Sequence, residues 1–287
     1  MELSSITVVT YNNLAVTQNM LSNLVKHTKT PYELIIIDNN SVSELKEWLK
    51  NYRPNSSYCQ KHKVIINQEN NGYAVACNQG LRESNGEYIA ILNNDVLVTE
   101  GWLKYLIAHL KKNPQAGMVG PMGKNIGAEQ NYAGIYGAMG YSYPPDQSLQ
   151  KFAKQLYEEW TGDYTETKVL IGCCLVFKRE VLNEVGLLDE GCKLSADDFD
   201  YSLRIRLAGY KLYVAEDVFV HHICHVGFKT LSQEERDRHI TEGWNYFHQK
   251  WNNHFSDEIT MDDLFYNQSP FYYTGLRKGR RLEAETI

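Results

Sequence analysis

Two polar clusters in the sequence contain carboxylates that can bind a cation or accept a proton. Asp95 ends the motif Asn93-Asn94-Asp95, directly after an apolar run. Further along, Asp197, Asp198 and Asp200 place three carboxylates within four residues. Carboxylate oxygens suit hard cations such as Mg²⁺ and Mn²⁺. Crowding also raises the pKa of a carboxyl group, which suits a general base.

Each cluster also has a purely structural interpretation, and both interpretations stay open at this point. Asn-Asn-Asp is ordinary turn chemistry at the end of a strand. Carboxylates in the first turn of a helix complement the helix dipole. The elements that position the two clusters must therefore decide between the alternatives.

Asp95 is delivered by a strand that is predicted to be buried on both faces. Residues 88–92 are all apolar or aromatic, which is typical of a parallel sheet. Earlier in the chain, strand patterns alternate with helix patterns. The predicted strands are residues 5–10, 34–37 and 64–66, and the predicted helices are 14–25, 44–49 and 73–84. This β-α-β order predicts an α/β fold with a doubly wound, mainly parallel sheet.

Polar residues follow each predicted strand, at Tyr11 and Asn12, at Asp38, at Asn71 and at Asp95. The carboxyl ends of parallel strands share one edge of a sheet, where open α/β folds bind ligands. The first strand is followed by no GxGxxG or GxxxxGK[ST] loop. Dinucleotide dehydrogenases and P-loop kinases are therefore disfavoured.

Four of these strand-end motifs together resemble a known family. They are Thr10-Tyr11-Asn12, residues 36–41 (IIDNNS), Asn70-Asn71-Gly72-Tyr73 with Asn78, and Leu92-Asn93-Asn94-Asp95. In this order they resemble the N-terminal half of the family 2 glycosyltransferases. The resemblance implies a GT-A fold and an inverting, nucleotide-sugar-dependent enzyme of the bacterial rhamnosyltransferase-like, glycan-assembly type.

The second half extends the resemblance through residues 172–190 (GCCLVFKREVLNEVGLLDE) and the acidic segment. The acidic segment is similar to the family pattern Glu-Asp-x-Asp-x-x-x-Arg, with Asp197 in place of Glu. The resemblance implies that Asp198 is the catalytic base, with Asp197 as the alternative, and that Asp200 and Arg204 are its structural neighbours.

The resemblance also implies a donor site and a metal site. The metal, Mn²⁺ or Mg²⁺, is assigned to Asp95 with a histidine that follows a later strand, and His221, His222 and His225 all remain candidates. Asp38 is expected to bind the pyrimidine of a UDP or dTDP sugar. The full set of donor-binding candidates is Thr10, Tyr11, Asn12, Asp38, Asn40, Asn71, Gly72, Asn78, Asn93, Asn94 and Asp95.

Composition limits the partners and the compartment. The formal net charge is −6, which argues against nucleic acid as a partner. The cysteines lack CxxC spacing, so we expect reduced thiols rather than a disulfide scaffold or structural zinc. No signal peptide or membrane span is recognisable. We therefore expect a cytoplasmic protein with at most peripheral contact at the inner face of the membrane.

The predicted domains are residues 1–228, a glycosyltransferase domain with a nucleotide-binding half (1–98) and an acceptor half (99–228), and a C-terminal helical extension and tail (229–287). The irregular stretch 123–167 is expected to form part of the acceptor wall or a surface excursion. The basic, aromatic tail has four alternative interpretations: it contacts a membrane surface, contacts an acceptor, pairs two subunits or is disordered.

The acceptor is expected to be a glycan, a lipid-linked sugar or a protein side chain. Two other functional classes remain: a nucleotidyltransferase on a related sheet, and a catalytically silent nucleotide-sugar-binding protein. The first lacks the phosphate loop that it needs. The second predicts loss of Asp95 or of the acidic segment, and both are present.

Overall fold

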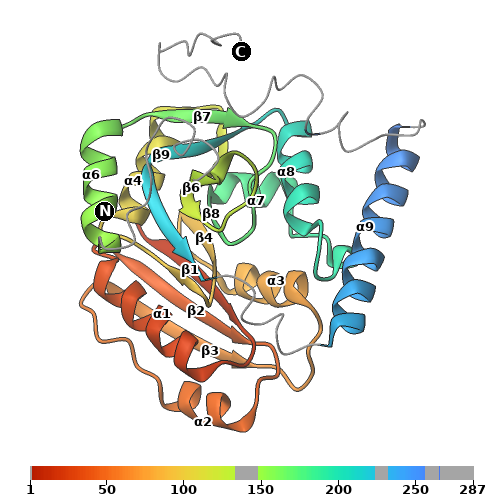
Figure 1. Ribbon diagram of the computed structural model, residues 1–287, viewed down its shortest axis with the longest axis horizontal. Coiled ribbons are helices and arrows are strands. Elements are labelled where there is room, and N and C mark those ends of the chain that lie inside the picture. Colours follow the sequence, from red (N-terminus) through yellow and green to blue (C-terminus); the bar gives the residue numbers. More distant parts are fainter. Residues whose placement is uncertain (1, 133–147, 224–231, 256–264, 266–287) are drawn as a thin grey trace.

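A computed structural model describes residues 2–132, 148–223, 232–255 and 265 of the chain (Figure 1). Its strands are β1 Ser4–Thr10, β2 Tyr32–Asp38, β3 Cys59–Ile66, β4 Tyr88–Asn93, β5 Val96–Leu97, β6 Ala116–Lys124, β7 Tyr164–Thr167, β8 Cys174–Lys178 and β9 Lys211–His222. Across these ranges they form one sheet in the order β3-β2-β1-β4-β8-β6-β9-β5, and β7 pairs with β9.

Helices cover both faces of this sheet. They are α1 Leu14–His27, α2 Ser43–Asn51, α3 Tyr73–Glu83, α4 Trp102–Lys112, α6 Leu149–Trp160, α7 Arg179–Val185, α8 Asp197–Leu207 and α9 Gln233–Phe255, with short 3-10 turns η1 Ala128–Gln130 and η2 Glu190–Cys192. Figure 1 shows α9 at the edge of the molecule beside α8, away from β2 and β3.

Alternate residues of each central strand enter different cores, as expected for strands covered on both faces. Ile6 and Val8 join a cluster with residues of α1, α2 and α4. Val9 and Ile37 join a second cluster with residues of α3, α6, α7 and α8. The uninterrupted apolar runs of the sequence follow from this two-sided burial.

The predicted fold class is confirmed, because β1, β2, β3 and β4 pair in parallel with crossover helices between them. The second half is more mixed than the sequence indicated, since β8 runs antiparallel to both β4 and β6. Residues 169–177 form an apolar run typical of a strand, but strand β8 begins only at Cys174, although Val169 and Leu170 are buried. Apolar character there reflects burial without sheet pairing.

Strand β6 was not recognised in the sequence because its residues, AGMVGPMGK, are rich in Gly and Pro. The structure puts those glycines to use. A Cβ atom on Gly120 would lie 2.6 Å from the side-chain nitrogen of Gln130. Helix α3 approaches β1 in the same way, because a Cβ atom on Gly80 would lie 2.2 Å from Thr7. These close contacts need residues without a side chain.

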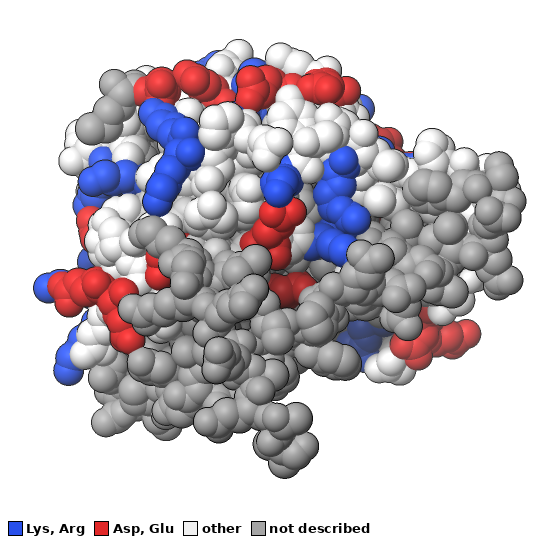
Figure 2. All heavy atoms as spheres, turned by 90° about the horizontal axis from the view of Figure 1, so that it is seen from above, with Lys and Arg blue, Asp and Glu red and all other residues white. Residues whose placement is uncertain are grey.

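Within the described ranges, no helix is both long and apolar enough to cross a bilayer. On the face seen in Figure 2, the coloured residues carry acidic and basic side chains with neutral surface between them. The tail beyond Phe265 and the stretch 133–147, which carried separate predictions, lie outside the described residues.

Candidate active site

The sheet register brings the motifs at the ends of β1, β2 and β4 to one edge. Thr10 pairs with Asp38 in the β1–β2 ladder, and Val9 pairs with Asn93 in the β1–β4 ladder. Parallel strands that end together present their next residues on the same side. The motifs containing Asp38 and Asp95 therefore share this edge.

Asp38 is fully buried and both of its carboxylate oxygens accept hydrogen bonds. The Thr10 hydroxyl donates to Oδ1 at 3.1 Å, and the Ser41 amide donates to Oδ2 at 3.0 Å. A carboxylate has about four acceptor sites, so further sites remain for an N–H donor. The arrangement fixes Asp38 rigidly at the end of β2.

Asn12 and Asn40 shape the neighbouring turns, and both adopt the left-handed conformation that Asn tolerates. The Asn12 amide donates to the Ser41 hydroxyl at 2.8 Å, and its Oδ1 accepts from the Val42 amide at 2.9 Å. Asn40 Oδ1 accepts from the Lys46 ammonium at 2.5 Å. These side chains join the loops that follow β1 and β2.

Asn39, which is not among the predicted site residues, connects the loop after β2 to the loop after β3. Its Nδ2 donates to Asn70 Oδ1 at 2.7 Å and to the Gly72 carbonyl at 3.1 Å. Its Oδ1 accepts from Asn67 Nδ2 at 3.2 Å and from the Asn71 amide at 3.4 Å. We call residues 11–13, 39–42 and 67–72 the amide-linked loops.

Asn78, another of the donor-binding candidates, is almost fully buried on α3. Its amide group donates to the Leu188 carbonyl and to Glu190 Oε1, both at 2.9 Å, and accepts from the Leu188 amide at 2.9 Å. Asn78 thus holds the turn between α7 and η2. Its assignment to donor binding stays a prediction.

Asp95 and His222 come together because β5 pairs with the end of β9, with Val96 opposite His222. His222 Nε2 lies 3.2 Å from Asp95 Oδ1, and the Asp95 side chain is nearly buried. Burial, Lys124 and His222 lower the pKa of His221, which pairs with Leu97 in the β5–β9 ladder. His225 lies outside the described residues.

Across residues 2–132, 148–223, 232–255 and 265, no cluster of three or more His, Cys, Asp or Glu side chains is spaced to hold a metal ion. Asp95 and His222 converge as a pair, one oxygen and one nitrogen donor. Such a pair fits a divalent cation that completes its coordination with oxygens from a bound phosphate group.

Asp198 is held in place by backbone amides from two elements. The Gly172 amide donates to Oδ2 at 3.0 Å, and the Phe199 amide donates to Oδ1 at 2.9 Å. Burial raises the pKa of Asp198, and these hydrogen bonds offset only part of the effect. The next residue, Cys173, accepts from the Asn93 amide through its carbonyl at 3.0 Å. The segment 172–173 therefore joins the acidic helix to the strand that leads to Asp95.

Tyr73, another residue that was not assigned a role, strengthens this junction. Its hydroxyl donates to Asn93 Oδ1 at 2.7 Å and also lies 3.1 Å from the Gly172 carbonyl. Asn94 turns away from this junction, and its Nδ2 donates to the Thr17 hydroxyl at 2.9 Å.

Asp197 is more buried than Asp198, with only 7% of its surface exposed. Burial and the neighbouring Asp198 carboxylate raise the pKa of Asp197 well above its ordinary value. Asp198 is the more accessible of the two, half-buried at the start of α8. This difference in exposure favours Asp198 as the residue that meets a ligand.

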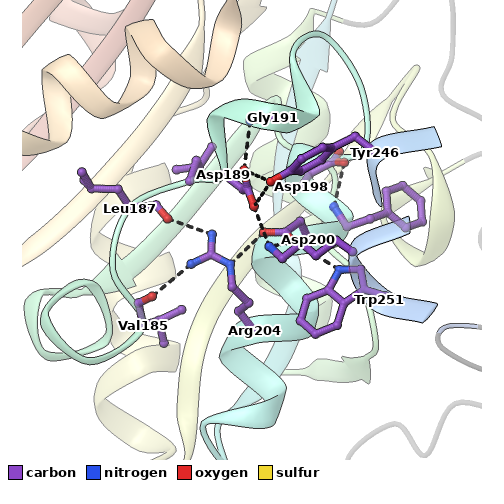
Figure 3. A network of polar contacts seen from close by, with 12 residues as sticks. Val185, Leu187, Asp189, Gly191, Asp198, Asp200, Arg204, Tyr246 and Trp251 are labelled. Carbon is purple, nitrogen blue, oxygen red and sulfur yellow. Dashed lines mark hydrogen bonds and ion pairs between the residues drawn. The ribbon is translucent and has the colours of Figure 1, made fainter. Parts of the chain in front are cut away.

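The last acidic residue, Asp200, is fully buried in a network of charges that we call the acidic corner: Asp189, Asp200, Arg204 and Lys250 (Figure 3). Arg204 Nε donates to Asp200 Oδ2 at 2.7 Å, and the two terminal nitrogens of Arg204 donate to the carbonyls of residues 185 and 187 at 3.0 and 2.8 Å. Arg204 thus links Asp200 of α8 to the turn that follows α7.

The model of the family described as "Glycosyl transferase family 2" matches residues 5–186. The chain is 25% identical over 288 residues to the uncharacterized protein y4gI of Sinorhizobium fredii, covering 96% of this chain and 30% of that protein. It is 26% identical over 210 residues to poly-beta-1,6-N-acetyl-D-glucosamine synthase of Staphylococcus epidermidis, covering 70% and 45%. The chain thus spans less than half the length of these relatives.

Among solved structures, a mannosyltransferase from Pyrobaculum calidifontis in complex with GDP-Man and Mn²⁺ superimposes with a TM-score of 0.58. The two are 19% identical, and the match covers 84% of this chain and 63% of the other. This likeness supports the fold, and the family match extends over more than half of the chain. The chain therefore belongs to glycosyl transferase family 2.

Proposed function

We propose that the chain transfers a sugar from a nucleoside-diphosphate sugar to an acceptor hydroxyl, with inversion at the anomeric carbon. The observation that carries the proposal is the junction at residues 172–173. Its amide holds the Asp198 carboxylate, and its carbonyl holds the strand end that leads to Asp95. A proton acceptor and a cation-binding pair thus flank one short segment.

We assign the donor base to the end of β2, at Asp38. Its buried carboxylate is fixed by Thr10 and Ser41 and has acceptor sites left for the imide N–H of uracil or thymine. The amide-linked loops, with Tyr11, Asn12, Asn40, Asn71 and Gly72, line this end of the sheet. A pyrimidine donor, UDP or dTDP, is favoured because these bases offer that N–H.

Asp95 and His222 would hold Mn²⁺ or Mg²⁺ together with the donor diphosphate. When bound, the cation supplies Lewis-acid stabilisation to the negative charge on the departing diphosphate. The Mn²⁺ in the complex of the Pyrobaculum mannosyltransferase is consistent with this assignment. Only one carboxylate is present in Asn93-Asn94-Asp95, so we expect cation affinity to depend on the diphosphate.

Asp198 is the general base. Its oxygen removes the acceptor proton while the acceptor oxygen bonds to the anomeric carbon and the bond from that carbon to the diphosphate breaks. Burial raises the pKa of Asp198, which makes the carboxylate a stronger proton acceptor. Attack on the face opposite the leaving group inverts the anomeric configuration.

The acceptor is proposed to be a growing glycan, a lipid-linked sugar or a protein side chain. The similarity to a poly-beta-1,6-N-acetyl-D-glucosamine synthase favours glycan assembly among these. A rhamnosyl or other hexosyl donor is compatible with the same site. A second subunit paired through residues 229–287 and contact with a membrane surface are further proposals that depend on the tail.

The first test is a thermal-shift screen of the purified chain with UDP, dTDP, GDP and ADP, each with and without Mn²⁺. A ligand at 100 times its dissociation constant adds about 2.7 kcal/mol to the free energy of unfolding. We expect Tm to rise by about 5 °C or more with UDP or dTDP and Mn²⁺. The matched sugar nucleotides, including UDP-N-acetylglucosamine and dTDP-rhamnose, are then assayed for transfer.

Asp95→Asn is compared with Asp237→Asn, which changes an exposed carboxylate on α9. The first variant should lose the Mn²⁺-dependent part of the Tm increase, and the second should keep it. If no pyrimidine diphosphate raises Tm, the donor assignment fails. If diphosphates bind but no donor is turned over, the chain is a silent nucleotide-sugar-binding protein.

A further inference from the structure

The segment that carries Asp198 has a strained backbone. Residues 189–200 lead from the turn after α7 into the first turn of α8, and Lys193 and Ala196 within it have φ angles of 54° and 62°. A positive φ angle is unfavourable for a residue other than Gly, so it persists only when the surroundings enforce it. Contacts from outside the segment must therefore hold it in shape.

Helix α9 supplies these contacts along the middle of the segment. The Ser195 hydroxyl donates to the Ile240 carbonyl at 2.9 Å. One turn later, Gly243 lies so close that a Cβ atom there would be 2.3 Å from the Cys192 carbonyl oxygen. The helix thus packs its backbone directly against residues 192–195.

Lys250 joins the two ends of the same segment. Its ammonium donates to Asp189 Oδ2 at 2.7 Å and to Asp200 Oδ1 at 2.5 Å. Asp200 is fully buried and the Lys250 side chain is only 26% exposed, so the contacts are shielded from solvent. Neighbouring residues of α9 add to them, since Trp251 Nε1 donates to Asp200 Oδ1 at 3.1 Å and the Tyr246 hydroxyl to Asp189 at 3.1 Å.

We propose that Lys250 is a positioning residue, which closes residues 189–200 and thereby sets the placement of the Asp198 carboxylate against Gly172. Lys250 lies outside residues 5–186, which match the family model, so family membership does not assign it. The kinetic part of this inference rests on the proposed function. The structural part, closure of the segment by Lys250, does not.

The test compares Lys250→Met with Lys250→Arg and with Arg238→Met, a control that removes an exposed cation from the same helix. Hydrogen exchange of the amides in 189–200 should be faster in K250M and unchanged in R238M. A misplacement of about 1 Å at a catalytic group costs on the order of 100-fold in rate. We therefore expect K250M to lower kcat about 10- to 100-fold with donor KM within about twofold, and K250R to restore most of it.

Unchanged exchange in K250M overturns the inference whatever the activity. Faster exchange with wild-type kcat overturns the positioning role. If K250M does not fold, Asp189→Asn takes its place, because it removes one partner of Lys250 and leaves the Asp200 contact. A wild-type chain without transferase activity defeats the proposed function, and the exchange data still decide the closure.

Discussion

The amide-linked loops and the acidic corner hold two halves of one site with opposite chemistry. In the loops, neutral amides and hydroxyl groups bond to one another and to the backbone, as Asn39 does to Asn70 and Gly72. In the acidic corner, buried carboxylates meet Arg204 and Lys250. Neutral hydrogen bonds are insensitive to pH and salt, whereas a buried charge that loses its partner is strongly destabilising.

This difference predicts how much stability each half loses when a single side chain is substituted. A loop held by many neutral bonds loses about 1 kcal/mol for each bond removed. The acidic corner is held by a few charges, so the loss of one charge should destabilise all of it. Asp198 lies beside this corner. The following substitutions test this contrast, beginning with the largest effect.

Asp198→Asn should lower kcat by about 1,000-fold, because the amide cannot accept the acceptor proton. The Tm increase on adding the nucleoside diphosphate should persist, since Asp38 and Asp95 are untouched. Transfer kinetics and thermal shift on the same sample check both statements. Activity within tenfold of wild type would show that another group is the base.

Arg204→Met should lower the free energy of unfolding by about 3 kcal/mol, because it leaves buried Asp200 with one positive partner fewer. Urea unfolding measures the loss. Lys211→Met, which breaks the exposed pair with Glu166, is the matched control and should change stability by less than about 1 kcal/mol. Equal losses in the two variants would contradict the contrast.

Asn78→Ala should lower the free energy of unfolding by about 2 kcal/mol, since the Leu188 amide and carbonyl lose their buried partner. Asn51→Ala, at an exposed hydrogen bond on α2, serves as the control. Donor affinity decides the other prediction for this residue. If Asn78 contacts the donor, the dissociation constant of the donor should rise in Asn78→Ala by more than the loss of stability explains.

Asp197→Asn should stabilise the protein by about 1 kcal/mol at pH 7, because the amide replaces a buried carboxylate whose negative charge is unfavourable. The raised pKa of Asp197 means that the folded state favours the protonated acid, so the penalty appears as pH rises above about 4, the unfolded value. Below that pH the two proteins should have equal Tm values. Thermal melts from pH 3 to pH 8 measure the crossover.

The sequence predicts the parallel half of the fold well because its signals are local. Each central strand is an apolar run that stops at a polar residue, and the sheet register then brings Asp38 and Asn93 to one edge. The convergence of Asp95 with His222 was predicted only through the family resemblance. Nothing in residues 95 or 222 alone indicates the β5–β9 pairing that joins them.

Other parts depend on contacts that no local pattern reports. Asn39 reads as a turn residue, yet its side-chain amide connects the loop after β2 to three residues of the loop after β3. Lys250 lies among aromatic residues at helical spacing, Trp244, Phe247 and Trp251, and this pattern gives no sign of Asp189 or Asp200 as its partners. Strand β7 is short and polar, with the sequence Tyr-Thr-Glu-Thr, and only its partner β9 defines it.

The buried thiols around the candidate site can report how often the structure around them opens. Cys77, Cys173, Cys174 and Cys192 are free and buried, and burial raises the pKa of each thiol, so the reactive thiolate is scarce in the closed molecule. Cys59 is half-exposed at the start of β3. Among the cysteines that the structure describes, an alkylating reagent should modify Cys59 first, and it should reach Cys173 and Cys192 only when the structure around them opens transiently. Labelling rates at these positions would then time such openings, residue by residue, without any added probe.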